Sequence, residues 1–280
     1  MIEVLPVPAS SIDLADPVNR QHPQAVGLVD WWLALPGLDG GRSWWNLFAR
    51  NYGTLTGMDA LTGGFRGTTR PGGLGDVLFD GSDDHVAVVG PSNWQLSPIT
   101  LCAWVLSTQA STNNPRVLSN DNPGATGIGF YLGRLDASGN AFYGIGAGGF
   151  RDSGYALTLN AWHHLAVTYD GVTARLYVDG TERDSYAAAS LTYTPTNSLE
   201  IGASQGLEAG TFWYGRIDDV RIYNYAISAT SLYGVHLNSM DGCPGLLNRI
   251  MPWFLHRPMQ WPFNAAWAMN ANNLIGCGVN

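Results

Sequence analysis

The clearest alternation of apolar and polar positions lies between residues 159 and 184. From His163 to Tyr169 the odd-numbered residues share one face of a strand and the even-numbered residues share the other. Asp170-Gly171 follows, then a second alternating stretch, and then Asp179-Gly180. Asp-Gly pairs between alternating stretches favour tight hairpin turns. The segment therefore predicts two consecutive antiparallel hairpins whose register is fixed by the turns.

The same short rhythm of strands and turns runs through most of the chain. Gly-rich residues 57–76 are predicted as a linker, and Ser228 is predicted to cap a single helix with Leu232, Val235 and Leu237 on its apolar side. Strands are predicted at 27–35, at the end of 42–56, on both sides of the Asp-Gly turn within 77–89, and at 98–107, 116–120, 128–134, 140–145, 198–202 and 211–225. Many short strands at regular spacing are typical of an all-β, two-sheet antiparallel jelly-roll sandwich.

The two ends differ from this central domain, which we place at residues 27–240. Residues 1–26 are rich in Pro and small polar residues and are predicted to form an extended N-terminal arm. Residues 241–280 form an apolar C-terminal tail that either folds back over the sandwich or docks on a partner. The aromatic residues predicted to form that partner interface are Trp253, Phe254, Trp261, Phe263 and Trp267.

Composition narrows the classes of function. The chain has 280 residues and a net charge of −8, and all 14 of its basic residues are Arg. This disfavours a nucleic-acid partner, which requires clustered basic residues, and the absence of Lys excludes Schiff-base chemistry. No apolar run is long enough for a membrane helix, and the first residues carry no secretory signal, so synthesis in the cytosol is expected. Cys102 is expected to be a buried thiol, and Cys243 and Cys277 either pair or stay free.

Several segments together resemble the LamG-like jelly-roll family within the concanavalin A-like lectin and glucanase superfamily. They occur in the family's order over about residues 27–238: GLVDWW, NYGTLTG, LFDGSDDHVAV, ITLCAWV, AWHHLAVTYDG, ARLYVDGTE, LEIGAS and YGRIDDVRIYNYAIS. The resemblance implies two curved antiparallel sheets, frequently a structural Ca²⁺ at the sandwich rim, and roles from glycan binding to adhesion. The TTRPGG linker and the PGLLNRI tail also resemble members encoded by bacteriophages.

Carboxylates around one turn are the candidate metal ligands. Calcium prefers clusters of carboxylate and carbonyl oxygens, which predicts a site built from Asp83, Asp218 and the backbone near Gly81. The alternative is that these Asp side chains cap turns and pair with Arg216 or Arg221. The family's usual pattern has an Asp where this chain has Asn46, which counts against the metal.

Tryptophan and glutamate residues are the candidates for sugar binding and for glycoside hydrolysis. Trp44, Trp45, Trp94 and Trp213 are candidates for stacking on sugar rings, although aromatic residues of this kind also fill cores. Hydrolysis of a glycoside requires two suitably spaced carboxyl groups, and the four Glu of the chain do not form the Glu-x-Asp-x-x-Glu pattern of the glucanases. His163 and His164 point to opposite faces of a strand and cannot bind one metal ion together.

These observations favour a noncatalytic structural or adhesion protein. We predict a virion surface or decoration protein, made in the host cytoplasm, anchored to other assembly proteins by its two ends, and forming a homo-oligomer. The alternatives are a lectin-like carbohydrate-binding module, which would act outside the cell, and a glycoside hydrolase. Neither a membrane nor a nucleic acid is expected as a partner.

Overall fold

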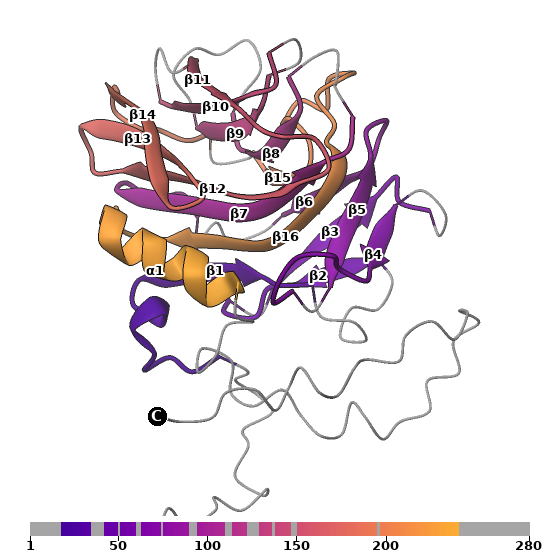
Figure 1. The fold of residues 1–280 in the computed structure, drawn as a ribbon, viewed down its shortest axis with the longest axis horizontal. Helices are drawn as coiled ribbons and strands as arrows, with labels where there is room; N and C mark the ends of the chain where they lie inside the picture. Colours follow the sequence, from indigo (N-terminus) through magenta and orange to yellow (C-terminus); the bar gives the residue numbers. More distant parts are fainter. Residues whose placement is uncertain are drawn as a thin grey trace, which may run out of the picture. The chain divides into compact units, whose positions relative to one another are not determined.

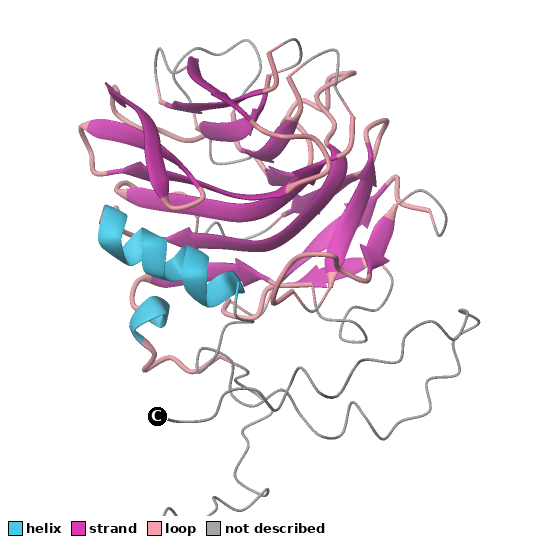
Figure 2. Ribbon diagram, viewed as in Figure 1, coloured by secondary structure: helices cyan, strands magenta, loops and turns pink. Residues whose placement is uncertain are grey.

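The computed structural model describes residues 18–34, 42–49, 51–59, 63–73, 75–89, 94–109, 114–121, 129–135, 138–146, 150–194 and 197–240. Strands dominate these residues, with one α-helix along one side (Figure 2). The strands are β1 (Leu28–Trp32), β2 (Ser43–Trp45), β3 (Tyr52–Thr56), β4 (Gly64–Arg66), β5 (Asp76–Asp80), β6 (His85–Val88), β7 (Ile99–Ser107), β8 (Arg116–Ser119), β9 (Phe130–Arg134), β10 (Asn140–Ile145), β11 (Arg151–Ala156), β12 (Trp162–Tyr169), β13 (Thr173–Val178), β14 (Thr181–Ala187), β15 (Leu199–Ile201) and β16 (Tyr214–Tyr223).

Two antiparallel sheets of eight strands each face one another (Figure 1). The first sheet has the order β14-β13-β12-β7-β16-β5-β4, and β1 pairs with the far part of the long strand β16. The second sheet has the order β11-β10-β9-β8-β15-β6-β3-β2. The all-β antiparallel sandwich predicted from the strand rhythm is therefore confirmed.

The residues that the alternation predicts to face the core do so in the first strand of the predicted hairpins. Leu165 and Val167 of β12 lie in the main core between the sheets, whereas Ala166 lies in a second apolar cluster on the outer side of the first sheet. Asp179 and Gly180 join β13 to β14 with φ angles of 52° and 73°. Two successive residues with positive φ form the type I′ turn that suits the twist of a hairpin.

The first sheet is covered on both faces, which explains the continuous apolar run of β7. All nine residues of that strand are buried, because one face meets the main core and the other meets the helix layer. The helix α1 (Ala229–Met240) runs along this outer face (Figure 1). The Ser231 N–H donates to Ser228 Oγ at 3.3 Å, which confirms the predicted N-cap.

Several predicted details differ from the structure. Leu232 and Val235 of α1 are buried, but Leu237 is exposed, because at about 100° per residue it lies on the side of the helix opposite Val235. The predicted linker at 57–76 contains the edge strand β4, and β11 was missed. The strands β5 and β6 are both correct but belong to different sheets, so the turn between them crosses from one layer to the other.

Part of the predicted N-terminal arm packs on the domain. Residues 18–26 include a short 3₁₀ helix, Pro23–Ala25, and both Val18 and Ala25 are buried in the outer cluster. Gln24 Nε2 donates to the Gly234 carbonyl of α1 at 2.9 Å. The domain therefore begins earlier than residue 27, and the remainder of the predicted arm lies outside the described residues. None of the described helices has the length and apolar character needed to span a membrane.

Candidate functional site

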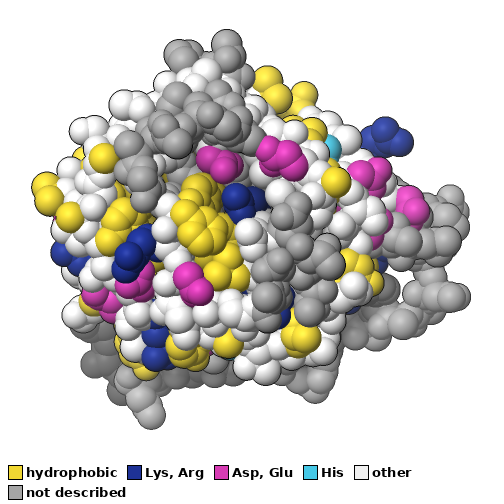
Figure 3. Space-filling view, turned by 90° about the horizontal axis from the view of Figure 1, so that it is seen from above, with side chains coloured by type: hydrophobic (Ala, Val, Ile, Leu, Met, Phe, Trp, Pro, Cys, Tyr) yellow, Lys and Arg dark blue, Asp and Glu magenta, His cyan; other side chains and the backbone are white. Residues whose placement is uncertain are grey.

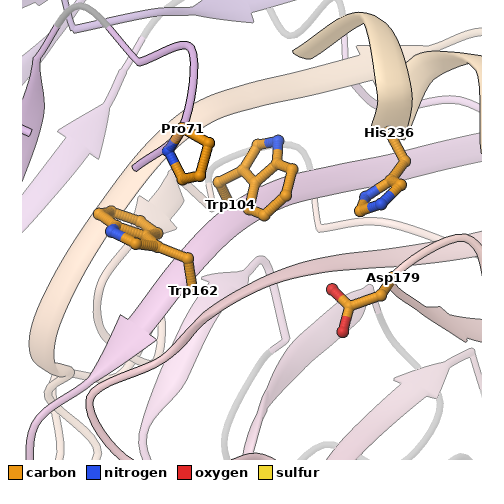
Figure 4. A pocket seen from close by; sticks show the side chains of 5 residues that line it. All are labelled: Pro71, Trp104, Trp162, Asp179 and His236. Carbon is orange, nitrogen blue, oxygen red and sulfur yellow. The ribbon is translucent and has the colours of Figure 1, made fainter. Parts of the chain in front are cut away.

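A pocket of about 400 Å³ opens on the outer side of the first sheet, near α1 (Figure 4). Its lining residues are Pro71, Trp104, Trp162, Asp179 and His236. In Figure 4 the Trp162 ring and the Asp179 carboxylate lie on opposite sides of this space, with Trp104 between Pro71 and His236. Pockets of this size with apolar walls and a few polar groups are typical of small-ligand sites.

Strand alternation places the aromatic side chains on this face. Ala103 and Val105 of β7 point into the main core, so Trp104 between them points outward. His164 of β12 pairs directly with Trp104 across the two strands. Trp162 lies two residues before His164 and therefore shares the outer face. The two strands thus supply an aromatic surface that the main core does not cover.

The Asp179 carboxylate is held in place by two neighbouring residues of β12. Its Oδ2 accepts a hydrogen bond from His163 Nδ1 at 2.8 Å, and its Oδ1 accepts one from the His164 N–H at 2.8 Å. The Thr158 N–H donates to His163 Nε2, which leaves the proton of a neutral ring on Nδ1. Burial alone would raise the pKa of Asp179, but the hydrogen bonds from His163 and His164 lower it overall. The group is therefore an anion at neutral pH with unused lone pairs.

Three aromatic rings pack against one another beside the pocket. The Trp104 and His236 ring centroids are 5.2 Å apart at 22°, and His164 lies 5.4 Å from Trp104. Burial lowers the pKa of His164 to about 3 and also lowers the pKa of His236, so both rings are neutral at pH 7. Trp104 Nε1, His164 Nδ1 and His236 Nδ1 are buried without hydrogen-bond partners. Since buried polar atoms are normally paired, these nitrogens favour a polar ligand or water nearby.

The remaining wall is fixed by the loop before β5. Trp162 is half-buried, and its Nε1 donates to Thr69 Oγ1 at 3.0 Å. The next residue, Arg70, places its guanidinium 5.3 Å from the Trp104 ring and donates to Asp218 Oδ2 at 2.7 Å. The pocket can therefore offer apolar ring surfaces and one carboxylate to a ligand.

Three of the four predicted sugar-stacking tryptophans are core residues. Trp44 and Trp213 are completely buried and Trp94 is 2% exposed, so none of them has a free face for a sugar ring. That prediction is wrong for these residues, because the space between two sheets takes up the largest apolar side chains. Trp45 is 41% exposed and lies edge-on to Tyr52.

Exposed aromatic side chains also occur on the second sheet. Figure 3, seen from above, shows apolar side chains gathered among charged ones on the side of the molecule where β8 to β11 lie in Figure 1. Among these strands the Arg116 guanidinium lies 4.6 Å from both the Tyr131 and Phe142 rings, and the neighbouring Phe150 is 54% exposed. This surface and Trp45 belong to the layer opposite the pocket.

The predicted calcium ligands are not brought together as a set. Asp80 pairs with Tyr214 on β16, and Asp218 lies four residues further along that strand, a distance of about 13 Å. Asp218 is fully buried and bound by Arg70, so the prediction that it joins Asp83 is wrong. A β-bulge in β16 turns Asp219 to the same side, where Arg221 binds it. Arg221, one of the two arginines predicted as ion-pair partners, therefore pairs with Asp219, whereas Asp218 pairs with Arg70, which was not predicted.

The acidic turn forms a smaller cluster. Carboxylate oxygens of Asp80, Asp83 and Asp84 lie within 4.8 Å of one another, next to the predicted Gly81. Asp84 is fully buried and its Oδ1 has no partner. Burial, with the nearby charges of Asp80 and Asp83, raises the pKa of Asp84 to about 6. Calcium at this turn remains a prediction.

The glutamates of the described chain are dispersed. Glu200 of β15 is 3% exposed, and burial raises its pKa to about 7. Glu182 is exposed on β14 in the other sheet, and Glu208 is exposed in the loop before β16. The predicted interface residues Trp253, Phe254, Trp261, Phe263 and Trp267, and the cysteines Cys243 and Cys277, lie outside the described residues. Cys102 is buried, as predicted.

The pocket residues were not predicted as a site. They come from separate segments of the chain, and no local motif joins them. One signal was present: Trp162 and His164 occupy the face of β12 opposite the core face. An aromatic residue on that face indicates either a covering layer or a ligand surface.

Comparison with known proteins agrees with this architecture. A sequence profile described as the concanavalin A-like lectin/glucanases superfamily matches residues 80–232. The chain belongs to this superfamily. No curated protein is recognisably similar to this concanavalin A-like chain in sequence.

Two solved structures are similar to this superfamily member in fold. Domain 4 of AbnA, a GH43 extracellular arabinanase from Geobacillus stearothermophilus in complex with arabinotriose, matches with a TM-score of 0.56 and 16% identity over 75% of this chain and 98% of that domain. The sialidase of Trypanosoma rangeli in complex with the inhibitor DANA matches with a TM-score of 0.57 and 14% identity over 76% of this chain and 33% of the sialidase. At such low identity the likeness shows the fold alone.

Proposed function

We propose that the chain is a noncatalytic carbohydrate-binding protein whose ligand occupies the pocket between Trp162 and Asp179. The observation that carries the proposal is the pairing of aromatic walls with one fixed carboxylate in a pocket of about 400 Å³. Sugar rings have an apolar C–H face that packs on aromatic rings and hydroxyl groups that donate to carboxylates. The arabinotriose complex of the AbnA domain supports the proposal by showing the same fold with an oligosaccharide.

A binding role suits this pocket better than hydrolysis. Glycosidases place two carboxyl groups on either side of the scissile bond. Asp179 is the single carboxylate among the described lining residues, and its hydrogen bonds hold it in the ionised form, whereas a general acid must carry a proton. A glycoside hydrolase remains the alternative, and steady release of reducing sugar from a polysaccharide, lost on Asp179→Asn, would favour it.

Glycan-array binding followed by calorimetry on the best ligand tests the proposal. Trp162→Ala should weaken binding at least tenfold, or about 1.4 kcal/mol, because it removes the exposed stacking surface. Trp45→Ala is the matched control, since it removes an exposed tryptophan from the opposite sheet and should leave affinity unchanged. Equal loss in both variants, or loss only in Trp45→Ala, would contradict the assignment of the pocket.

A role in a virion or another assembly is the second candidate. It is supported by the sequence of the tail. Residues 241–280 contain three Trp and two Phe in a segment whose pattern does not fit one regular helix or strand. Under this proposal the protein is a homo-oligomer or binds other assembly proteins, and it is located in the virion. Mass measurement of the full chain and of a chain ending at residue 240 tests it. A monomeric mass for each of the two chains would contradict the interface role of the tail.

A further inference from the structure

We infer that the pocket selects neutral glycans and discriminates against acidic ones such as uronic or sialic acids. This inference rests on the proposed function and names the class of its ligand. It follows from the balance of charges around the pocket and from the unused acceptor capacity of Asp179.

Asp179 carries the negative charge of the pocket. Its side chain is 33% exposed, so a ligand can reach it. Each carboxylate oxygen has two lone pairs, and the hydrogen bonds from His163 and His164 use one on each. Two acceptor positions therefore remain on one carboxylate, and they suit two adjacent hydroxyl groups of a sugar ring.

No described cation at the pocket is left to neutralise a second anion. The Arg70 guanidinium lies 5.3 Å from the Trp104 ring, and Asp218 already neutralises it in a pair whose side chains are 1% and 0% exposed. His164 and His236 are neutral at pH 7 because burial lowers their pKa values. Both ring nitrogens of His163 are engaged, by the Thr158 N–H and by Asp179, so neither is available to an anionic ligand.

The net charge of these groups is −1. Arg70 and Asp218 cancel, the imidazoles of His164 and His236 contribute no charge, and Asp179 remains. A carboxylate on a sugar bound against Trp162 would lie within several Å of Asp179, and repulsion between like charges at about 6 Å in a partly solvated site weakens binding roughly tenfold. A neutral sugar of the same shape avoids this repulsion and keeps the hydroxyl contacts.

The test uses matched glycan pairs in which a neutral sugar is replaced by its uronic acid or carries a terminal sialic acid. The purified full chain is measured on an array and by calorimetry at low and high salt. We expect the wild type to bind the neutral member about tenfold more tightly, and the preference to shrink at high salt because screening weakens repulsion. Asp179→Asn should weaken neutral binding and bring the ratio close to one. Asn is well tolerated at a positive φ, so the turn should be preserved.

Different outcomes contradict the inferred selectivity and the proposed function. If acidic glycans bind as well as neutral ones and Trp162→Ala abolishes both, the pocket binds sugars but the inferred selectivity is wrong. If the wild-type preference persists unchanged in Asp179→Asn, that carboxylate is not its origin and the inference is wrong. If no glycan binds, or Trp162→Ala binds like the wild type, the proposed function itself is wrong and the selectivity falls with it.

Discussion

Replacing Arg70 by Met should destabilise the folded protein far more than an ordinary change of surface charge does. Arg70 Nε and Nη2 both donate to Asp218 Oδ2, at 3.0 and 2.7 Å, and both side chains are almost completely buried. The variant leaves the Asp218 carboxylate buried with the Ala34 N–H as its remaining hydrogen-bond donor. Breaking a buried pair in this way costs about 3–5 kcal/mol. For a domain of this size the melting temperature should fall by roughly 6–20 °C.

A surface pair provides the matched control. Arg175 Nη1 lies 2.8 Å from Asp170 Oδ2, but these side chains are 33% and 39% exposed. Arg175→Met should therefore cost less than about 1 kcal/mol, because water already solvates both charges. Urea denaturation followed by tryptophan fluorescence measures both variants on one scale.

The cost of Arg70→Met should also depend on pH. Burial already raises the pKa of Asp218, and removing the guanidinium takes away the charge that opposes this rise. The folded variant then binds a proton more tightly than the unfolded chain does. Stability is retained at low pH and lost as pH rises through the folded-state pKa, so the deficit relative to wild type should be larger at pH 8 than at pH 5.

Two results would refute this reasoning. The first is a loss below about 1 kcal/mol, equal to that of Arg175→Met, which would mean that the Arg70 pair is solvated. The second is a deficit that does not change with pH. A double variant, Arg70→Met with Asp218→Asn, should regain much of the loss, because Asn keeps an acceptor for Ala34 and removes the buried charge.

Three further predictions concern other parts of the fold. Addition of Ca²⁺ after chelation should raise the melting temperature of the wild type and have less effect on Asp83→Asn; an unchanged melting temperature in the wild type would contradict a calcium site. Gly180→Ala should destabilise more than Gly171→Ala in thermal melts, because both positions have positive φ but a Cβ at 180 would lie 2.5 Å from the Tyr233 ring; equal melting temperatures would contradict this. Glu200→Gln should have the same stability as the wild type near pH 4 and be more stable by up to about 3 kcal/mol above pH 7. The reason is that the folded-state pKa of Glu200 is about 7, so the wild type loses stability as this acid ionises. Urea midpoints that follow parallel pH profiles in the two proteins would contradict this.

The sequence predicted those features that depend on neighbouring residues. Asp179-Gly180 predicted the turn between β13 and β14, and the alternation along β12 predicted which residues of that strand face the core, because a turn type and a period of two are local properties. The separation of β5 and β6 into different sheets could not be predicted in the same way. Both strands alternate correctly, and nothing in a short turn states which layer the next strand joins.

The candidate site was harder to predict for a related reason. Trp44 and Trp162 look alike in sequence, since each is an aromatic residue in a short strand, yet one is buried between the sheets and the other lines a pocket. What distinguishes them is the layer that covers each face. The pocket needs the turn at Asp179, the loop at Pro71 and the helix at His236, and only the folded chain brings them together.

The central position of β7 has a consequence for synthesis on the ribosome. This strand is hydrogen-bonded to β12 on one side and to β16 on the other, and β16 is made more than one hundred residues later. At about 5–20 residues per second, roughly 5–20 seconds pass between completion of the two strands. During that interval one edge of a mainly apolar strand has no partner. The nascent chain therefore depends on chaperones or on rapid late closure to avoid aggregation.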